Sequence, residues 1–409
     1  MATKRVALLA QVFRGIRIAG PACALAVLFA SVGCDDTMMI DNSLDEGGAA
    51  GTRAPNQGIG GMGGGGTAPI ATGGTEAPTA TGGVGGQGQT SPVPGGCAPI
   101  STTPSVVNPC GHAFGLAVSP DGQLLSVGMD SQSPSVRVWR LTDGMPLPDL
   151  PGQTSGDTTY KVAFSPDGKL LAAAGTTSST SGRVPWVRFW DVATAKLIRA
   201  FQPDSSDYVS ALAFSSNGSL IVTGGMLGPA EVWRVADGGL VHAFDVPNST
   251  HNAHFSPDDS KLIVATANGE ARVFDIASGA LVLGPLATAQ EMSDAQMSPD
   301  GTQLATTWQS GNEQNSVRIY DATSGKLLQS LGGHLAYISE TLWIDQNRIV
   351  SDDWNGQIIL WQRNALGSFQ VAKSWSTGGQ SMQMGVSPDK TTIVAGGADG
   401  GQGFVFLRL

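Results

Sequence analysis

After residue 97 the chain alternates between short apolar segments and polar turn sequences. Residues 162–175 read VAFSPDGKLLAAAG, a short strand pattern, a Ser-Pro-Asp-Gly turn and a second run of small and apolar residues. An Asp-Gly pair between two such runs is typical of a tight turn in a β-hairpin. Related segments begin at residues 116, 212, 253, 295 and 385. This part of the chain is therefore predicted to repeat one hairpin-based unit many times.

Two independent landmarks give the same number of repeats. The first is the turn residue of the SPDG-like motif, and the second is the aromatic residue near the end of a short strand such as VRVWR or VRFWD. Each occurs seven times, and successive turn residues are 41 to 50 positions apart. The turn residues are Asp121, Asp167, Asn217, Asp258, Asp300, Asp345 and Asp389. The aromatic residues are Trp139, Trp190, Trp233, Phe274, Tyr320, Trp361 and Phe406.

Each repeat has room for four short strands. The hairpin supplies strands a and b, the aromatic residue lies in strand c, and a second turn such as DATSGK (321–326) leads into strand d. Four strands in roughly 40–50 residues are typical of a β-propeller blade. We therefore predict an all-β fold, a seven-bladed propeller of four-stranded blades over residues 97–409. Residues 100–107 (ISTTPSVV) are expected to supply the outer strand of the last blade and so close the ring.

The repeats resemble WD40 repeats. The SPDG turn, the strands VRVW and VRFWD and the Gly-His pairs at 111–112 and 333–334 carry the resemblance, which covers residues 98–409. Trp-Asp itself occurs once among the repeats, at 190–191, and Asn268 and Asn355 stand where the family has a structural Asp. The buried His–Asp network of the family is therefore expected to be mostly absent. The resemblance implies a rigid interaction platform, although some propeller relatives are enzymes.

The N-terminus has the pattern of an export signal. Basic residues precede an apolar run from Ile18 to Val32, which is short for a membrane span but suits a signal peptide over residues 1–33. The run ends in LFASVGC and resembles a bacterial lipoprotein signal, which implies that Cys34 is lipidated and becomes the new N-terminus. Ser31 departs from the aliphatic residue that this pattern prefers. An ordinary signal cut nearby is the alternative.

Residues 34–96 are predicted to form a disordered tether. From Gly47 to Gly96 the chain is mostly Gly, Thr, Ala and Pro, which cannot bury enough apolar surface to fold. Its mean span would be roughly 40 Å. The stretch GIGGMG (58–63) has the spacing of a dinucleotide-binding loop but lacks a flanking strand and helix. Cys97 and Cys110 are an even pair in an exported protein and are predicted to form a disulfide at the start of the propeller.

The charge of the chain argues against one class of partner. The formal net charge is −10, and the first 33 residues contribute basic groups only, so the remainder is more acidic still. An acidic surface repels phosphate backbones. Nucleic acid is therefore not expected as a partner.

One face of the propeller is expected to carry the binding site. The short a–b and c–d turns share one face, and the longer b–c and d–a loops share the other, where binding sites tend to lie. Aromatic residues near those loops would anchor a partner, unless each packs between blades. They are Trp186, Tyr208, Trp308, Tyr337 and Trp354.

Two histidines are predicted to be structural rather than metal-binding. His254 lies in a strand a where the first three repeats have alanine, and it is expected to be a satisfied structural histidine. His251 precedes it by three residues and would point to the opposite face of the strand, so no shared metal site is predicted.

Recurring charged residues are also expected to be structural. An arginine stands two residues before the strand c aromatic in four repeats, and covering or pairing at the blade surface is favoured over anion binding. These are Arg137, Arg188, Arg272 and Arg318. Acidic residues of the d–a loops are expected to lie on the surface, where they would keep the protein soluble. These are Asp157, Asp204, Asp207, Glu291 and Asp294.

No catalytic, metal-binding or cofactor-binding residue is predicted. The sequence has no GxSxG, HExxH, P-loop or CxxC motif, and strand a, which would line the channel, offers mostly Ala, Val and Phe. We therefore expect a non-catalytic, monomeric scaffold that binds a protein of the bacterial cell envelope through its loop-rich face. It would be exported, face the periplasm or the cell surface, and contact the membrane only through its lipid. The alternatives are a lactonase-like or dehydrogenase-like propeller enzyme and a carbohydrate-binding propeller, whose sign would be coplanar exposed rings.

Overall fold

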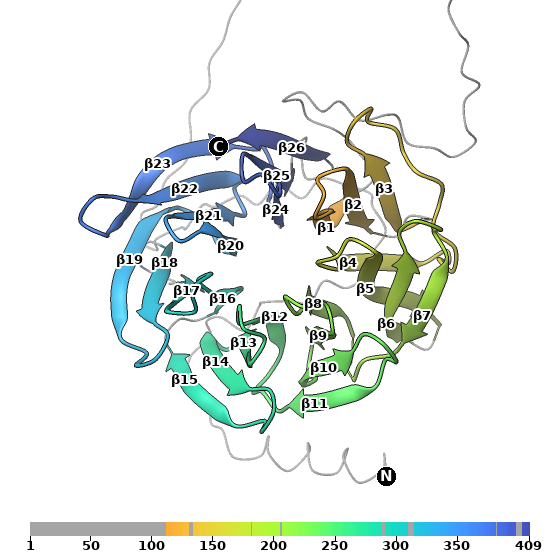
Figure 1. Ribbon diagram of the computed structural model, residues 1–409, viewed down its shortest axis with the longest axis horizontal. Helices are drawn as coiled ribbons and strands as arrows, with labels where there is room; N and C mark the ends of the chain where they lie inside the picture. The colour runs from red at the N-terminus through yellow and green to blue at the C-terminus, as the bar shows by residue number, and fades with distance from the viewer. Residues whose placement is uncertain are drawn as a thin grey trace, which may run out of the picture. The chain divides into compact units, whose positions relative to one another are not determined.

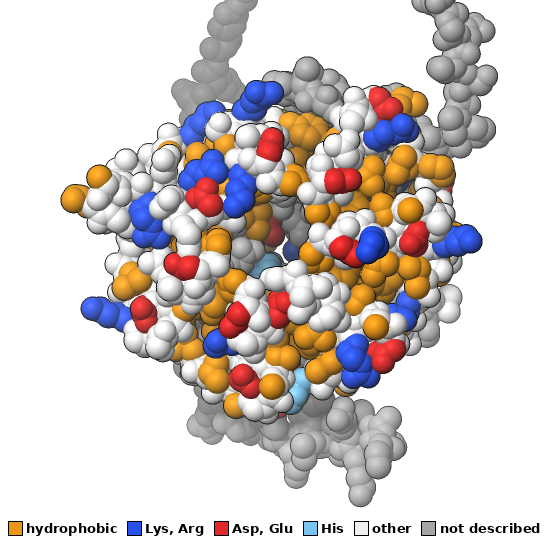
Figure 2. Space-filling view, in the orientation of Figure 1, with side chains coloured by type: hydrophobic (Ala, Val, Ile, Leu, Met, Phe, Trp, Pro, Cys, Tyr) orange, Lys and Arg blue, Asp and Glu red, His pale blue; other side chains and the backbone are white. Residues whose placement is uncertain are grey.

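The computed structural model describes residues 112–409, apart from 131–133, 181, 205–206, 288–290, 310–314, 382 and 398–402. The described residues form strands β1 to β26 and no helix. The strands make seven separate antiparallel sheets, which are arranged as a ring around a central axis (Figure 1). Figure 2 shows that the ring is hollowed at its centre. The fold is a seven-bladed β-propeller, as the repeat pattern predicts.

Each blade is a meander that runs from the axis to the rim. Blades 1 to 3 are β1 (Ala113–Val118), β2 (Leu124–Met129) and β3 (Val136–Arg140); β4 (Asp157–Phe164), β5 (Leu170–Ser179), β6 (Gly182–Asp191) and β7 (Leu197–Phe201); and β8 (Val209–Phe214), β9 (Leu220–Gly225), β10 (Ala230–Arg234) and β11 (Leu240–Phe244). Blades 4 and 5 are β12 (Thr250–Phe255), β13 (Lys261–Thr266), β14 (Glu270–Asp275) and β15 (Leu281–Ala287); and β16 (Ala295–Met297), β17 (Gln303–Trp308), β18 (Asn315–Asp321) and β19 (Leu327–His334). Blades 6 and 7 are β20 (Ile338–Asp345), β21 (Arg348–Asp353), β22 (Gln357–Arg363) and β23 (Phe369–Ser376); and β24 (Met384–Val386), β25 (Thr392–Gly397) and β26 (Gly403–Arg408).

The hydrophobic core lies between the blades. Seven clusters of buried side chains each join two neighbouring blades. One of them joins Met129 and Trp139 of blade 1 to Phe404 of blade 7, so apolar packing closes the ring. Burial of an apolar side chain of this size contributes about 1.5–3 kcal/mol. Strand b of each blade is covered on both faces, as the burial of β13 from Leu262 to Thr266 illustrates. This accounts for the alanine- and valine-rich runs of the sequence.

Blades 1 and 7 each have three described strands. In blade 1 an irregular segment fills the outer position. The Leu147 N–H donates to the Val138 carbonyl at 2.8 Å, and the Gln153 side chain bonds both backbone groups of Val136. A regular ladder cannot form here because prolines lack the N–H donor. The prolines are Pro146, Pro148 and Pro151.

Some of the predicted features belong to residues outside the described part of the chain. They are the signal peptide over 1–33, lipidation of Cys34, the tether over 34–96, the Cys97–Cys110 disulfide and the closing strand over 100–107. Within the described ranges, no helix is long and apolar enough to cross a membrane.

The SPDG turns are held by side chains. In blade 4 the Ser256 hydroxyl donates to Asp258 at 2.5 Å and accepts from the Lys261 N–H at 2.9 Å, while Asp258 accepts from the Ser260 N–H at 3.1 Å. The bonds from Ser256 and Ser260 lower the pKa of Asp258 to about 2. The residue after the aspartate has a positive φ, which favours glycine.

Replacing Lys390 by Gly is expected to stabilise the protein. Lys390 occupies the glycine position of the blade 7 turn with a φ of 58°. The left-handed conformation costs an ordinary residue about 1–2 kcal/mol, and the greater freedom of glycine in the unfolded chain offsets part of this, so we expect a net gain of about 0.5–1 kcal/mol. Urea unfolding of the full chain measures the change. The reverse substitution, Gly301→Lys at a φ of 73° in blade 5, is the matched control and should destabilise. A lower midpoint for Lys390→Gly would contradict this account.

Candidate functional site

A repeated β-bulge shapes the mouth of the central channel. In β4 the register passes from Thr159 opposite Gly175 to Lys161 opposite Ala174, so Tyr160 has no partner across the ladder. A bulge leaves one residue unpaired and changes where its side chain points. The innermost strands of five blades carry this irregularity at the same place. The extra residues are Phe114, Tyr160, Ser210, His251 and Ser339, and all five line one pocket.

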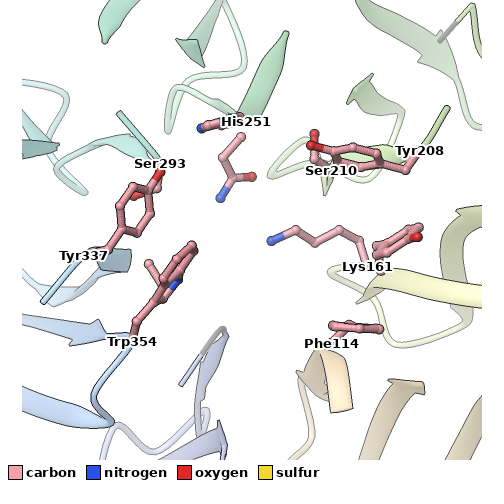
Figure 3. Close-up of a pocket in the computed structure, with 11 residues that line it drawn as sticks. Phe114, Lys161, Tyr208, Ser210, His251, Ser293, Tyr337 and Trp354 are labelled. Carbon is pink, nitrogen blue, oxygen red and sulfur yellow. The ribbon is translucent and has the colours of Figure 1, made fainter. Parts of the chain in front are cut away.

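This pocket has a volume of about 200 Å³ and lies at the mouth of the channel (Figure 3). Serine hydroxyls, the Asn252 amide, the His251 imidazole and the Lys161 ammonium group share its wall with five aromatic rings. The rings belong to Phe114, Tyr160, Tyr208, Tyr337 and Trp354.

The five rings form two groups. Tyr337 and Trp354 have ring centroids 4.5 Å apart and an angle of 35° between their planes. Tyr160 lies 5.5 Å from Phe114 and 5.5 Å from Tyr208, with angles of 39° and 52°. In Figure 3 the first group faces Lys161 and Phe114 across the pocket. Because all of these pairs are tilted, they do not provide the coplanar platform expected of a carbohydrate site.

Three of the five aromatic residues singled out from the sequence meet in this pocket. Tyr208 and Tyr337 come from d–a connections, and Trp354, with 45% of its surface exposed, comes from the b–c connection of blade 6. Burial raises the pKa of both tyrosines, so their hydroxyls are neutral donors at physiological pH.

Phe114 and Tyr160 were not predicted from the sequence. Both lie inside a strand a, where strict alternation does not reveal the bulge. The signal that could have found them is spacing from the turn serine. Phe114 stands five residues before Ser119, and Tyr160 stands five residues before Ser165. Ser210, His251 and Ser293, which also line the pocket, have the same spacing from their turn serines.

The other two aromatic residues lie away from the channel pocket. The Trp186 ring is buried and lies 4.0 Å below the Arg188 guanidinium group. It covers Gly175, where a Cβ atom would come within 2.7 Å of the ring. The Trp308 ring lies 3.8 Å below Arg318. Neither ring lines the channel pocket. Trp186 packs between blades 1 and 2, which is the alternative considered for it.

Arginines of strand c form ion pairs within their blades. Arg188 pairs with Asp157, and Arg272 pairs with Glu270 at 2.8 Å. The expectation that Asp157 lies on the surface is wrong, because its side chain is fully buried. Burial raises the pKa of Asp157, but the hydrogen bonds from Arg188 and Thr177 outweigh it and hold the pKa below its usual value. The carboxylate is buried because its cationic partner comes from the same blade.

A second layer of polar side chains lies next to the bulge residues. Lys161 and Glu340 directly follow bulges, and Glu340 is buried. One Glu340 oxygen accepts from the Met384 N–H of blade 7 at 2.7 Å. The expectation that strand a presents mostly Ala, Val and Phe to the channel is wrong, because Lys161 and the polar bulge residues Ser210, His251 and Ser339 line the pocket there.

His254 is a satisfied structural histidine, as predicted. Its Nε2 atom lies 2.8 Å from an oxygen of Asp294 in the next blade. The second Asp294 oxygen accepts from the Thr341 N–H of blade 6 at 3.0 Å. Asp294 is fully buried, so its expected place on the surface is wrong. Its carboxylate instead joins three neighbouring blades.

Two carboxyls in this layer bind protons more tightly than usual. Burial raises the pKa of Glu340 to about 7, although the positive charge of Lys161 opposes the shift. Burial, followed by the charge of Glu340, raises the pKa of Asp352 well above its usual value. Asp352 accepts from the Glu340 N–H at 2.9 Å and from the Ser381 hydroxyl at 2.5 Å. At neutral pH these carboxyls therefore carry less negative charge than the sequence suggests.

Blade 6 contains a complete buried His–Asp network. His334 Nδ1 donates to Asp353 at 3.0 Å, and His334 Nε2 accepts from the Ser351 hydroxyl at 2.7 Å. The Trp361 indole donates to the same hydroxyl oxygen at 2.8 Å. The interpretation of Asn355 as the replaced structural Asp is wrong for this blade, because Asp353, two residues earlier, occupies that role. Asn355 donates its own N–H to Asp353 at 3.0 Å.

This network has the residue types of a Ser-His-Asp catalytic triad but not its accessibility. Ser351, His334 and Asp353 are all buried, and the Ser351 oxygen is already engaged by Trp361. A nucleophile must reach a substrate carbonyl, so this serine is structural. Over the described ranges, no group of three or more His, Cys, Asp or Glu side chains could hold a metal ion.

Comparison with known proteins agrees with this architecture. Residues 195–228 match the family model described as WD domain, G-beta repeat. The described part of the chain is a WD40-like β-propeller. An uncharacterized WD repeat-containing protein of Synechocystis is 34% identical over 117 residues, which are 29% of this chain and 30% of that protein. WD repeat-containing protein SL1-17 of Schistosoma mansoni is 28% identical over 180 residues, 43% of this chain and 56% of that protein. The chain thus spans about a third to just over half of the length of these relatives.

Solved structures support the fold of this WD40-like propeller. A chain in a crystal structure of the mitotic checkpoint complex superposes with a TM-score of 0.65 at 15% identity, and the match covers 76% of this chain and 97% of that one. At this identity the likeness shows the fold alone. Neither of the two WD repeat relatives carries the name of an enzyme.

Proposed function

We propose that this WD40-like propeller is a non-catalytic scaffold that binds another protein of the cell envelope through the pocket at its channel mouth. The observation that carries the proposal is the group of five aromatic rings around that pocket. Tyrosine and tryptophan side chains are enriched among the residues that dominate binding energy in protein interfaces. They come from the longer loops and the strand bulges of a rigid ring, which presents them without reorganisation.

The proposal includes export and a lipid on Cys34. Its support is the N-terminal sequence, in which a basic segment and an apolar run end at LFASVGC. A tether between the lipid and the propeller would raise the effective concentration of the domain for partners on the same membrane. We propose that the propeller acts as a monomer in this setting.

A capture experiment tests the binding face. The full chain, immobilised in mild detergent, would be incubated with solubilised envelope proteins, alongside a variant with Tyr337→Ala and Trp354→Ala. We expect a stoichiometric partner on the wild type and at least about a tenfold loss on the variant, because truncating a central interface residue commonly costs about 2 kcal/mol or more.

The matched control is Leu366→Ala. Leu366 is 91% exposed in a turn between strands c and d of blade 6, away from the pocket. It should capture the partner as the wild type does. Equal capture by all three proteins would place the interface elsewhere, and no stoichiometric partner at low or physiological salt would contradict the scaffold proposal. The described geometry does not favour the enzyme or carbohydrate alternatives, because the His–Ser–Asp group is buried and the rings are tilted.

A further inference from the structure

Lys161 places a positive charge among the aromatic rings of the pocket. Its side chain extends from strand β4 into the space between the two ring groups (Figure 3). None of the ion pairs formed by the described residues involves Lys161. A partly desolvated ammonium group gains most from an anionic, hydrogen-bonding partner.

Three buried acids of the neighbouring blade walls do not fill that role. Glu340 directs an oxygen to the Met384 N–H, and Asp294 is engaged by His254 and by the Thr341 N–H. Asp352 is engaged by Ser381 and the Glu340 N–H. The carboxyl groups are thus bound into the blade walls, and raised pKa values at Glu340 and Asp352 weaken their charge further.

The surroundings of Lys161 select the kind of anion. Tyr337 and Trp354 offer apolar ring surface across the pocket. The Ser210 and Ser339 hydroxyls already donate to backbone carbonyls, which leaves Lys161 as the charged donor of the pocket. The pocket holds one lysine and no arginine among the described residues that line it. A single ammonium group matches one negative charge, whereas a phosphate carries nearly two and favours arginine-rich sites.

We propose that the pocket binds a carboxylate carried by the partner polypeptide, with Lys161 as its counter-ion and with apolar groups beside it against the rings of Tyr337 and Trp354. The inference rests on the proposed function and specifies the chemistry of the partner. The carboxylate belongs to a Glu or Asp side chain or to the C-terminus of the partner chain, and the two sources are distinguished by the test.

Three short peptides with an uncharged fluorophore serve as probes for the full-length protein. The first is Ser-Leu-Glu-Leu-Ser with both ends blocked, the second has Gln in place of Glu, and the third has Gln and a free C-terminal carboxylate. Fluorescence anisotropy measures their affinities. We expect at least one carboxylate peptide to bind about tenfold more tightly than the blocked Gln peptide, because charge-assisted hydrogen bonds are the stronger class. The peptide that does so identifies the source of the carboxylate.

Variants of Lys161 test the counter-ion. Lys161→Met should abolish the preference for the carboxylate peptide, and Lys161→Arg should retain most of it. The matched control is Lys169→Met, which removes a lysine of the same blade that is 77% exposed and pairs with Asp167 in a turn. It should leave all affinities unchanged. Circular dichroism and the unfolding midpoint would show that each variant is folded.

The outcomes separate this inference from the proposed function. Equal binding of the carboxylate and Gln peptides, a preference that survives in Lys161→Met, or no binding of any peptide would overturn the inference. If the envelope partner is captured by Lys161→Met but lost by the Tyr337 and Trp354 variant, the scaffold proposal stands and the carboxylate inference fails. Loss of the partner in both variants, together with a carboxylate preference, supports both.

Discussion

Replacing His334 by Leu is expected to lower the free energy of unfolding by about 3 kcal/mol, because it leaves the buried Asp353 carboxylate without its side-chain hydrogen-bond donor. The Asp353 side chain is only 1% exposed, and His334 is completely buried beside it. Burial raises the pKa of Asp353, but the hydrogen bond from His334 and backbone N–H groups outweigh it and hold the pKa below its usual value. Without the imidazole, the carboxylate would stay buried with only backbone N–H donors. Urea unfolding of the full chain at pH 7 measures the loss.

Two further variants test whether the loss of stability comes from the unpaired Asp353 carboxylate. His334→Leu combined with Asp353→Leu should cost less than the sum of the two single substitutions, because removing both partners leaves no unsatisfied buried group. His242→Leu is the matched control, since His242 is half-buried in strand d of blade 3 and stacks on Phe244. We expect His242→Leu to lower the free energy of unfolding by roughly 1 kcal/mol or less, because it changes a residue near the surface. This loss is well below the one expected for His334→Leu. A His334 variant as stable as the wild type would show that the network does not hold blade 6 together.

The number of blades could be predicted because it depends on residues that repeat. Each strand c aromatic is tied to one hairpin turn in the sequence, and the structure places Trp139, Trp190 and Trp361 in the clusters between blades. These positions follow a local rule, a large ring at the end of a short strand that must be buried. The rule holds in six of the seven repeats, and Trp233 of blade 3 is partly buried.

The site was only partly predictable, because one local irregularity changes what the channel presents. A strict period of two assigns the inward positions of strand a to small residues. The bulge inserts Tyr160 directly before Lys161, and both residues line the pocket. Tyr337 and Trp354 were found because they lie in loops, where no periodicity had to be assumed.

Buried charges could not be predicted from the sequence for a different reason. Whether an acid is buried depends on partners far along the chain: Asp157 is matched by Arg188 in its own blade, and Asp294 by His254 and Thr341 in two others. In blade 6 the acid that completes the histidine network is Asp353 rather than Asn355, a difference of two residues within one connection. Composition and repeat spacing do not reveal such pairings.

The same buried acids predict an unusual dependence of stability on pH. Glu340 has a pKa of about 7 in the folded protein, raised by burial from the ordinary value of 4.5. Between these two values the folded protein holds a proton that the unfolded chain has released, so stability falls as the pH rises through this window. A pKa difference of one between the folded and unfolded states corresponds to about 1.4 kcal/mol, so Glu340 contributes on the order of 2–3 kcal/mol that is lost between about pH 5 and pH 8.

Glu340→Gln is expected to remove most of this loss, because the amide oxygen can still accept from the Met384 N–H and carries no charge at any pH. Urea unfolding of both proteins at pH 5, 6, 7 and 8 measures it, and the difference between the two curves isolates Glu340 from other titrating groups. Burial also raises the pKa of Glu231 to about 7, so part of the slope should remain in the single variant and decrease further when Glu231→Gln is added, while Asp352, whose pKa is also raised, still contributes. Glu270→Gln is the matched control, since that carboxylate pairs with Arg272 and is partly exposed.

Equal slopes for the wild type and Glu340→Gln would mean that the channel carboxyl is ionised throughout. The wall beside Lys161 would then be negative at neutral pH, and the pocket would repel the carboxylate that we propose it binds.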